Sequence, residues 1–389
     1  MGEAWLECGD HGHQTYTYDY ARSLLPGPGT GAGMWRYQAL LPRPDEATRY
    51  PLPVGGTPLR APRALRQLLE LPGLWLKDET TGPSASNKDR ATALVIDEGL
   101  RTGVRVVSTA STGNAALSTA IGGAAAGLAV VIFVPDDCAP AKVDLMVARG
   151  AYVFRVREGY RAAFELSRRA AARFTWLDRC TGLNPLTVEA KKTTSFEVWE
   201  QLGQRAPEAV VLPVGDGVTL IGAAKGFREL VACGALPRVP RIIAVQAQNC
   251  APLAAQWHGN PAPAHWPGTV ADGIEVPQPM LGDWTLDEVR AARGDFVTVS
   301  DAEILDAADL LAGVAGIASE PAGAAAFAGL RRAVADGLLG ARETVVAWVT
   351  GANLPAEPAG AARPGAVFTI SADLDAVAAA LAGTPIPVP

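Results

Sequence analysis

The chain alternates between short runs rich in β-branched residues and longer runs rich in alanine, and this alternation restricts the fold more than any other feature. Strands separated by helices predict parallel sheets, because each helix carries the chain back so that the next strand runs in the same direction. The first series places strands at residues 74–77, 104–107, 128–134, 151–156 and 176–177, and helices at 90–100, 115–126, 139–149 and 160–174.

A second series of the same kind follows. It places helices at residues 189–202, 220–232, 301–314 and 322–336, and strands at 209–214, 241–246 and 344–349. Residues 260–284 are rich in proline, tryptophan and glycine, which predicts a long surface loop or lid. A linker at 355–364, a strand at 367–370 and a helix at 373–382 complete the pattern. Two series within 389 residues predict two domains of ordinary size.

Composition excludes several classes of protein. A net charge of −6 leaves no basic footprint for nucleic acid. The five cysteines are odd in number and scattered, which is unlike a disulfide framework, so we expect a reducing, cytoplasmic location. Residues 1–10 carry acidic side chains and no basic segment, so we expect no secretory signal. Residues 115–135 are uncharged, but their glycines and the β-branched residues from Val130 onward predict a buried helix, a turn and a buried strand, not a membrane span.

Lys88 stands where a predicted helix begins, after the small polar residues Ser84 and Ser86. An amine desolvated near the positive end of a helix is kept partly neutral, and the neutral amine is the nucleophilic form. Most lysines are solvated surface charges, so the position of Lys88 is weak evidence by itself. Polar turns also follow three predicted strands, at residues 108–114, 215–219 and 350–353. Ligands bind at such strand ends in open α/β sheets, so we expect these turns and Lys88 to serve one site.

Taken together, these stretches resemble those of the fold type II enzymes, which are similar to tryptophan synthase β and use pyridoxal phosphate, and within them the threonine synthases. The resemblance runs in order over residues 50–355, and motifs in a fixed order are far more specific than any one of them. The matching stretches are residues 55–59 (Gly-Gly-Thr-Pro-Leu), Lys77, 84–90, 111–114, 191–193, the loop at 215 with Gly226 and Phe227, 320–322 and 350–351.

The resemblance implies a fold type II α/β architecture, with two open parallel-sheet domains and the cofactor in the cleft between them. It implies an N-terminal arm at residues 1–50, a large cofactor-binding domain formed by 51–90 and 186–355, and a smaller domain at 91–185. Residues 356–389 would be a C-terminal extension that packs on the large domain. The resemblance also suggests a homodimer with a small amino-acid substrate, and with neither a nucleic-acid nor a membrane partner.

By the same resemblance, Lys88 forms the imine with pyridoxal phosphate and shuttles the proton at the substrate Cα. Asn114 would bind the ring hydroxyl of the cofactor. Thr350 would face the pyridine nitrogen with a neutral hydroxyl, which favours elimination and replacement over transamination. The cofactor phosphate would be bound by Gly215, Asp216, Gly217, Val218 and Thr219. The substrate would be bound by Lys77, Ser84, Ser111, Thr112, Gly113 and Thr187.

Several positions depart from the family pattern. Asp216 stands where asparagine is usual, so its carboxylate must point away from a phosphate, be protonated or bind a cation. Val218 and Thr219 replace an ending similar to Gly-Asn, and Asn87 replaces a phenylalanine before the lysine. Thr187 stands where the family places an arginine that grips the substrate phosphate, and the change removes a charge-assisted contact.

These departures leave the substrate open. The first interpretation is a threonine synthase-like carbon–oxygen lyase that performs γ-elimination and replacement on O-phosphohomoserine or a related γ-substituted amino acid. The alternative is β-elimination or β-replacement on a serine-, threonine- or diaminopropionate-type amino acid in a specialised pathway. A third, a catalytically silent cofactor-binding protein, is disfavoured by the intact Lys88, Asn114 and Thr350. A surrogate arginine, from the 260–284 region or from Arg155 or Arg157, would restore the first interpretation.

Cys8, His11 and His13 have a spacing that recurs in zinc sites. Many threonine synthases begin with a Cys-x-x-Cys-Gly segment, and His11 stands at the second cysteine. No second ligand pair follows, so this region cannot complete a tetrahedral site, and we interpret it as a family remnant without a metal. The aromatic residues between 16 and 37 predict an arm that packs on the body or on a partner subunit.

Overall fold

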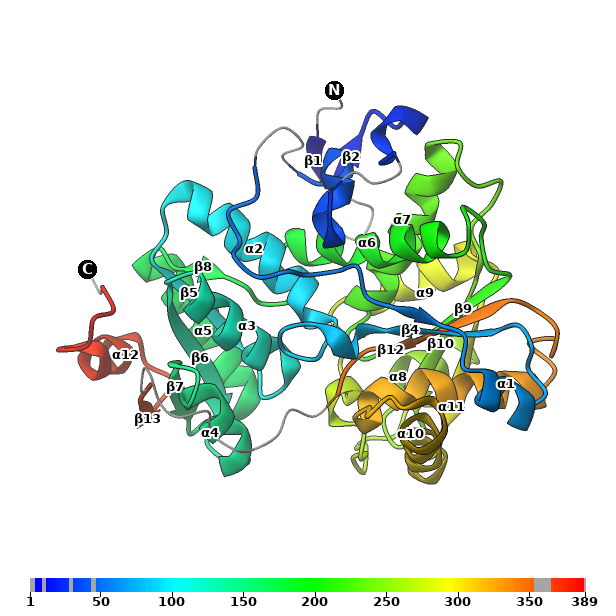
Figure 1. Cartoon of the computed structure of the whole chain (residues 1–389). Coiled ribbons are helices and arrows are strands. Elements are labelled where there is room, and N and C mark those ends of the chain that lie inside the picture. The colour runs from blue at the N-terminus through cyan, green and yellow to red at the C-terminus, as the bar shows by residue number, and fades with distance from the viewer. Residues whose placement is uncertain (1–3, 9–11, 28–30, 43–46, 353–364, 388–389) are drawn as a thin grey trace. The chain divides into compact units, whose positions relative to one another are not determined.

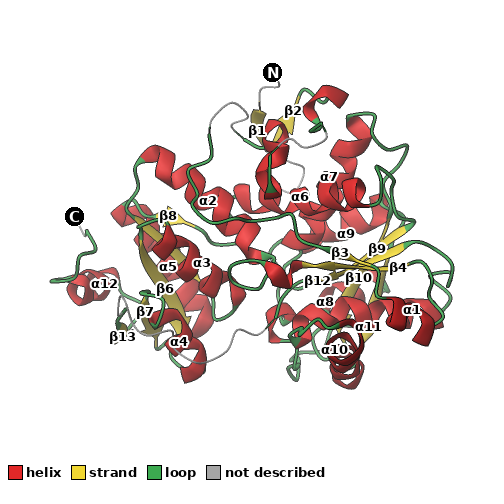
Figure 2. Cartoon of the chain, in the orientation of Figure 1, coloured by secondary structure: helices red, strands yellow, loops and turns green. Residues whose placement is uncertain are grey.

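A computed structural model describes residues 4–8, 12–27, 31–42, 47–352 and 365–387. The chain divides into two compact units. Unit 1 comprises Met1–Glu46, Gly55–Asn87 and Val188–Asn353, and unit 2 comprises Ala47–Val54, Lys88–Thr187 and Leu354–Pro389. Each unit is built on one main sheet whose strands alternate with helices (Figures 1 and 2). The predicted parallel α/β architecture is therefore confirmed.

Unit 1 is built on a six-stranded sheet in the order β11-β10-β9-β12-β4-β3. Its parallel strands are β4 (Leu74–Asp78), β9 (Ala209–Pro213), β10 (Arg241–Ala247), β11 (Asp295–Val299) and β12 (Val345–Val349), and β3 (Leu59–Arg60) runs antiparallel to β4. The helices are α1 (Arg63–Leu68), α6 (Leu186–Gln201), α7 (Val218–Ala232), α8 (Pro252–Trp257), α9 (Gly282–Ala291), α10 (Asp301–Ala315) and α11 (Pro321–Ala335).

Helices cover both faces of this sheet, as Figure 1 shows for α6 and α7 on one side and α10 and α11 on the other. Successive side chains of a strand point to opposite faces. On β9, Val210 and Leu212 therefore join the core beneath α6 and α7, whereas Ala209 and Val211 join the core beneath α10 and α11. Burial on both faces explains why β9 is apolar at every position instead of alternating.

Unit 2 contains a five-stranded parallel sheet in the order β13-β7-β6-β5-β8. Its strands are β5 (Val106–Ala110), β6 (Ala129–Pro135), β7 (Tyr152–Val156), β8 (Leu177–Asp178) and β13 (Val367–Ile370). Its helices are α2 (Lys88–Thr102), α3 (Asn114–Ala125), α4 (Pro140–Val147), α5 (Gly159–Phe174) and α12 (Leu374–Leu381). The uncharged residues 115–135 form α3, a turn and β6, as predicted, and in the described part of the chain no helix is long and apolar enough to cross a membrane.

The C-terminal segment differs from its prediction. It was expected to pack on the large domain, but β13 pairs in parallel with β7 and extends the sheet of unit 2. Val377 and Leu381 of α12 are buried in the core of the same unit. The prediction was wrong because a strand-like run can add to any free sheet edge, and the residues themselves do not indicate which edge is free.

The N-terminal arm packs on its own chain. Strands β1 (Ala4–Cys8) and β2 (Gln14–Tyr18) form a hairpin, and the Tyr18 hydroxyl donates a hydrogen bond to Glu189 Oε2 at 2.8 Å. Beneath Tyr18 lies a buried cluster of two lysines and two glutamates from α6 and α7: Glu189, Lys192, Lys225 and Glu229. The four charges balance, which is the condition under which buried ions are tolerated. Of the proposed metal-binding segment, His11 and the Cys8 side chain lie outside the described residues.

Candidate active site

The segment before Lys88 is tethered to the end of strand β12. The Asn87 amide donates to the Thr350 carbonyl at 2.9 Å, and the Ala352 amide donates to the Ala85 carbonyl at 2.9 Å. Ala85 has a φ of 55°, a left-handed conformation that costs a non-glycine residue about 1–2 kcal/mol. These two backbone tethers offset that cost and fix the path of the chain into the first residue of α2, Lys88.

The loop of residues 215–219 joins β9 to α7, as predicted. Gly217 caps α7 with a φ of 94°, a conformation that favours glycine. A Cβ on Gly217 would lie 1.9 Å from the hydroxyl oxygen of Thr285 on α9, so glycine is also required by space. The first N–H groups of a helix have no partner within it, so the start of α7 presents donors suited to an anion.

Asp216 does not face the open end of α7. Its carboxylate accepts a hydrogen bond from the Met280 amide at 2.7 Å, just before α9 begins. Burial raises the pKa of Asp216 to about 6, while the amides of Met280 and Leu281 oppose the rise. The sequence left three possibilities open for Asp216. The geometry agrees with the first of them, in which the carboxylate points away from the start of α7, here toward the start of α9.

Thr219 lies at the start of α7 and accepts two hydrogen bonds from side chains on other segments. Lys191 Nζ, on α6, donates to Thr219 Oγ1 at 2.9 Å, and Asn87 Nδ2 donates to the same oxygen at 3.2 Å. Lys191 and Asn87 are each only 3% exposed. Neither residue was assigned a role from the sequence; the departures at Asn87 and Thr219 were the only signal for this contact.

In unit 2 the turn of residues 111–114 joins β5 to α3. The Gly113 amide donates to Ser111 Oγ at 3.2 Å, and the Gly113 carbonyl accepts from the Ala116 amide at 3.0 Å. Asn114 is the first residue of α3. The half-buried turn thus places hydroxyl groups and backbone N–H groups at a helix start, an arrangement that suits a carboxylate.

Arg179, which was not singled out from the sequence, reaches Lys88 from the end of β8. Its fully buried guanidinium donates to the Lys88 carbonyl at 3.3 Å, to Thr92 Oγ1 at 3.0 Å and to Thr181 Oγ1 at 2.6 Å. Burial lowers the pKa of Arg179 to about 10. The contact with the Lys88 carbonyl fixes the backbone of the first turn of α2.

Three predicted substrate residues are buried in the fold. Lys77 Nζ donates to Glu197 Oε2 at 2.7 Å, to the Thr57 carbonyl at 2.6 Å and to a third side-chain oxygen, so its three N–H donors have partners. The Thr187 hydroxyl donates to the Asn184 carbonyl at 2.8 Å, and Ser84 is fully buried beside another serine. This geometry favours structural roles for Lys77, Ser84 and Thr187 over contact with a substrate.

Neither residues 260–284 nor Arg155 or Arg157 supply a substitute for the phosphate-binding arginine that Thr187 replaces. Residues 260–284 contain no arginine. Arg155 donates to the carbonyls of Asp136 and Cys138, and Arg157 donates to Ser371 Oγ at 3.3 Å. Both guanidinium groups therefore serve the packing of unit 2.

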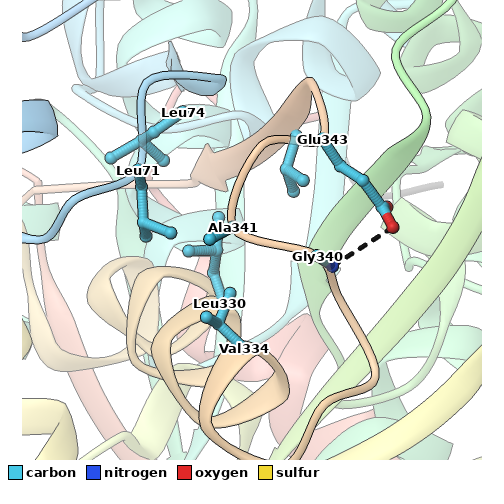
Figure 3. Close-up of a pocket in the computed structure, with 8 residues that line it drawn as sticks. Leu71, Leu74, Leu330, Val334, Gly340, Ala341 and Glu343 are labelled. Atoms are coloured by element: carbon cyan, nitrogen blue, oxygen red, sulfur yellow. Dashed lines mark hydrogen bonds between the residues drawn. The ribbon is translucent and has the colours of Figure 1, made fainter.

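A small cavity in unit 1 is too small for an amino acid. It has a volume of about 10 Å³ and is lined mostly by apolar side chains around α11 and the loop before β12, as Figure 3 shows for Leu71, Leu74 and Leu330. A space of this size holds at most one water molecule. It belongs to the packing of the core.

Comparison with known proteins identifies the family. The model of a family described as "Pyridoxal-phosphate dependent enzyme" matches residues 50–351. The chain belongs to this family. It is 36% identical to the threonine synthase of Methanosarcina acetivorans over 82% of this chain and 79% of that protein. It is 34% identical to the threonine synthase of Mycobacterium tuberculosis (strain H37Rv) over 85% of this chain and 89% of that protein.

Solved structures show the same fold. The processed form of threonine deaminase isoform 2 from Solanum lycopersicum aligns with a TM-score of 0.65 at 23% identity, covering 77% of this chain and 84% of that one. A fungal L-serine ammonia-lyase from Rhizomucor miehei also aligns with a TM-score of 0.65 at 23% identity, covering 76% of this chain and 93% of that one. The fold type II architecture and the dependence on pyridoxal phosphate, both expected from the sequence, are confirmed.

The described residues fit this cofactor. The start of α7 offers hydrogen-bond donors, and the one carboxylate of the loop, Asp216, is directed elsewhere. The Thr350 hydroxyl is on a residue only 8% exposed and has no hydrogen-bond partner among the described residues, so it is available to a ring nitrogen. Within the parts of the chain that the structure describes, no group of histidine, cysteine or acidic side chains is arranged to bind a metal.

Proposed function

We propose that this protein is a threonine synthase-like lyase that converts O-phosphohomoserine, or a closely related γ-substituted amino acid, into threonine or its analogue. The main support is the set of curated threonine synthases that match at 30–36% identity over most of their length. In the reaction the Cγ–O bond breaks and releases phosphate, and water then adds its hydroxyl at Cβ and a proton at Cγ. Atoms balance without an oxidant or reductant.

Lys88 is proposed as the group that binds the cofactor and moves the proton at the substrate Cα. Its helix turn is held by Arg179 and by the backbone tethers of Asn87 and Ala85, so the backbone from which the amine extends has a fixed position. A fixed acid–base group reacts as if at high local concentration. When bound, the cofactor supplies the electron sink that stabilises negative charge at Cα.

The remaining roles follow from the donors that each turn presents. Ser111, Thr112 and Gly113 are proposed to bind the substrate carboxylate at the start of α3, and Asn114 the ring hydroxyl of the cofactor. The loop from Gly215 to Thr219 is proposed to bind the cofactor phosphate. The Thr350 hydroxyl is proposed to face the ring nitrogen, which it does not protonate.

One observation favours a second candidate function. Thr187 replaces the arginine that the family uses for the substrate phosphate, and its buried hydroxyl is bonded to Asn184. An enzyme without this phosphate-binding arginine is suited to substrates that have no distal phosphate. Serine, threonine and diaminopropionate are such substrates, and they undergo β-elimination or β-replacement. The two candidates differ in the products they form.

The test is to incubate the purified protein with O-phosphohomoserine, O-phosphoserine, threonine and 2,3-diaminopropionate and to identify the products by mass spectrometry. We expect threonine and inorganic phosphate from O-phosphohomoserine. Keto acids or β-replaced amino acids formed only from the other three substrates would establish the second candidate. The control is Lys88→Ala: borohydride should link the cofactor covalently to the wild type and not to this variant.

We also propose that the enzyme is a cytoplasmic homodimer. Buried, unpaired cysteines suit a reducing compartment, and the described cysteines Cys138, Cys180, Cys233 and Cys250 are all of this kind. Sedimentation at several protein concentrations measures the oligomeric state, and a monomer at all concentrations would contradict the homodimer.

A further inference from the structure

The segment that follows β8 lies at the edge of the unit 2 sheet where ligands are expected. Strands β8 and β5 are parallel neighbours (Figure 1), and the Arg179 amide continues their pairing by donating to the Ser108 carbonyl at 2.9 Å. Parallel neighbours end at the same edge of a sheet, and ligands bind at that edge in open α/β sheets. Residues 179–181 therefore follow β8 at the same edge at which the turn of residues 111–114 follows β5.

Arg179 carries a buried charge that is not paired with a carboxylate. Its guanidinium is fully buried, and its three hydrogen bonds all go to neutral oxygens. Among the described residues no acidic side chain forms an ion pair with it, and Asp89 and Asp178 act on it only at longer range. Buried ions are usually paired with an ion of opposite charge, so the surroundings of Arg179 favour an anion.

Thr181 presents a hydroxyl group that Arg179 orients. Arg179 Nη1 donates to Thr181 Oγ1 at 2.6 Å and so uses one of the two lone pairs of that oxygen. The proton of the half-buried Thr181 hydroxyl therefore points away from the guanidinium, and in the described part of the chain it has no acceptor. The charge behind the hydroxyl strengthens any hydrogen bond that the hydroxyl donates, because successive hydrogen bonds polarise one another.

The same guanidinium connects Thr181 to the proposed catalytic lysine. A second nitrogen of Arg179, Nη2, donates to the Lys88 carbonyl at 3.3 Å. One planar group thus contacts both the first turn of α2 and the Thr181 hydroxyl. The turn of residues 111–113 is already proposed to bind the α-carboxylate of the substrate, so an anion at Thr181 would be a second, distal one. A phosphorylated amino acid carries such a group.

We propose that Arg179 and Thr181 together recognise a phosphate monoester at the distal end of the substrate, with the Thr181 hydroxyl as the donor and the Arg179 charge behind it. The pair takes over the task of the arginine that Thr187 replaces, from the same segment between β8 and α6. The inference rests on the proposed function and deepens it, because it names the residues that distinguish a phosphorylated substrate from an unphosphorylated one.

The experiment uses calorimetry on the cofactor-loaded enzyme to measure the dissociation constants of 2-amino-5-phosphonopentanoate and 2-aminopentanoate. The two ligands share the amino-acid end and the carbon chain and differ only in the phosphonate, which stands for the phosphate but cannot leave. Thr181→Val removes the hydroxyl and keeps the shape of the side chain, whereas Thr181→Ser keeps the hydroxyl. Arg179→Met removes the charge, and Arg179→Lys keeps it.

Thr181→Val and Arg179→Met should each weaken the phosphonate ligand about 10- to 100-fold, the range for loss of a hydrogen bond to a charged group, and change 2-aminopentanoate less than about twofold. Thr181→Ser and Arg179→Lys should retain most of the preference for the phosphonate. Thr119→Val is the matched control, because the buried Thr119 hydroxyl of the same unit donates to the Ala115 carbonyl at 2.7 Å. It should leave the ratio of the two constants unchanged.

Equal weakening of both ligands would overturn the inference, since it would indicate general damage or contact with the α-carboxylate. An unchanged ratio in Thr181→Val would also overturn it, and this half-buried variant decides the matter if thermal unfolding shows that Arg179→Met does not fold. A wild type that binds both ligands equally would overturn this inference, while threonine formation from O-phosphohomoserine tests the proposed function separately. A phosphonate preference that depends on both residues, in an enzyme that forms no threonine, would uphold the inference and refute the proposed function.

Discussion

Replacing Gly217 by alanine tests whether the start of α7 depends on glycine for both its backbone and its space. The backbone term is the φ of 94°, which costs a residue with a Cβ about 1–2 kcal/mol. The steric term comes from a Cβ that would lie 1.9 Å from Thr285 Oγ1, and overpacking of a buried site costs about 1–3 kcal/mol. We therefore expect Gly217→Ala to lower the free energy of unfolding by about 2–5 kcal/mol.

A double-mutant cycle separates the two terms. Thr285→Ala removes the oxygen that the new Cβ would strike, whereas Thr285→Ser keeps it. Combined with Gly217→Ala, the alanine at 285 should recover the steric part, a coupling energy of about 1–3 kcal/mol, and leave the backbone part. The serine at 285 should recover little, which makes it the matched control.

Urea unfolding followed by tryptophan fluorescence measures these differences. Eight of the nine tryptophans belong to the segments of unit 1, so the signal reports the unit that contains Gly217. The reasoning would be refuted if Gly217→Ala changed the free energy of unfolding by less than about 1 kcal/mol, below the backbone term alone. It would also be refuted if the alanine and serine variants of Thr285 gave equal recovery.

Two further predictions concern buried polar groups. Asp216 has a pKa of about 6, above its ordinary value of 3.8, so its protonated form stabilises the fold below about pH 4 and this stabilisation is lost as the pH rises through 6. Asp216→Asn keeps an acceptor for the Met280 amide, so it should match the wild type at pH 4 and exceed its free energy of unfolding by about 1–3 kcal/mol at pH 8; a pH-independent difference would contradict this. Tyr18→Phe removes the hydroxyl that donates to Glu189, and leaving a buried carboxylate oxygen with one partner fewer should cost about 1–3 kcal/mol. For Tyr18→Phe the measurement is again urea unfolding, and an unchanged midpoint would show that the hydroxyl contributes nothing.

The features predicted correctly from the sequence are turns and helix starts, which depend on residues adjacent in the chain. The turn before α7 was predicted because a strand-like run, two glycines and a helix-like run follow one another directly, and the structure places that helix at Val218–Ala232. Lys88 was expected at a helix start for the same local reason, and it is the first residue of α2. By contrast, β11 (Asp295–Val299) and α9 (Gly282–Ala291) were missed, because β11 contains only three apolar residues and the apolar residues of α9 are interrupted by charges.

Contacts between side chains that are far apart in the sequence could not be predicted from it. Nothing near Asp216 indicates that its carboxylate turns to Met280, 64 positions later. From the sequence, a solvated surface charge and a functional residue were equally good interpretations of Lys191. The close approach of α6 to Gly222, which brings the Lys191 ammonium to Thr219, is visible only in the structure. Arg179 was overlooked because a lone arginine after a two-residue strand carries no local signal. Side-chain partners of this kind are set by helix packing, which depends on tertiary structure.

The order of the segments has a consequence for synthesis on the ribosome. The chain passes from one unit to the other after Glu46, Val54, Asn87, Thr187 and Asn353, so neither unit is contiguous. Strand β13 covers the edge of β7 and is synthesised after all the other strands of its sheet, which precede it in the chain by nearly 190 residues or more. Until it emerges, β7 offers unpaired N–H and C=O groups to any other nascent chain. A stop codon or a proteolytic cut before Val367 would leave that edge of β7 open, so we expect β13 to protect the sheet of unit 2 from pairing with other chains and from aggregation.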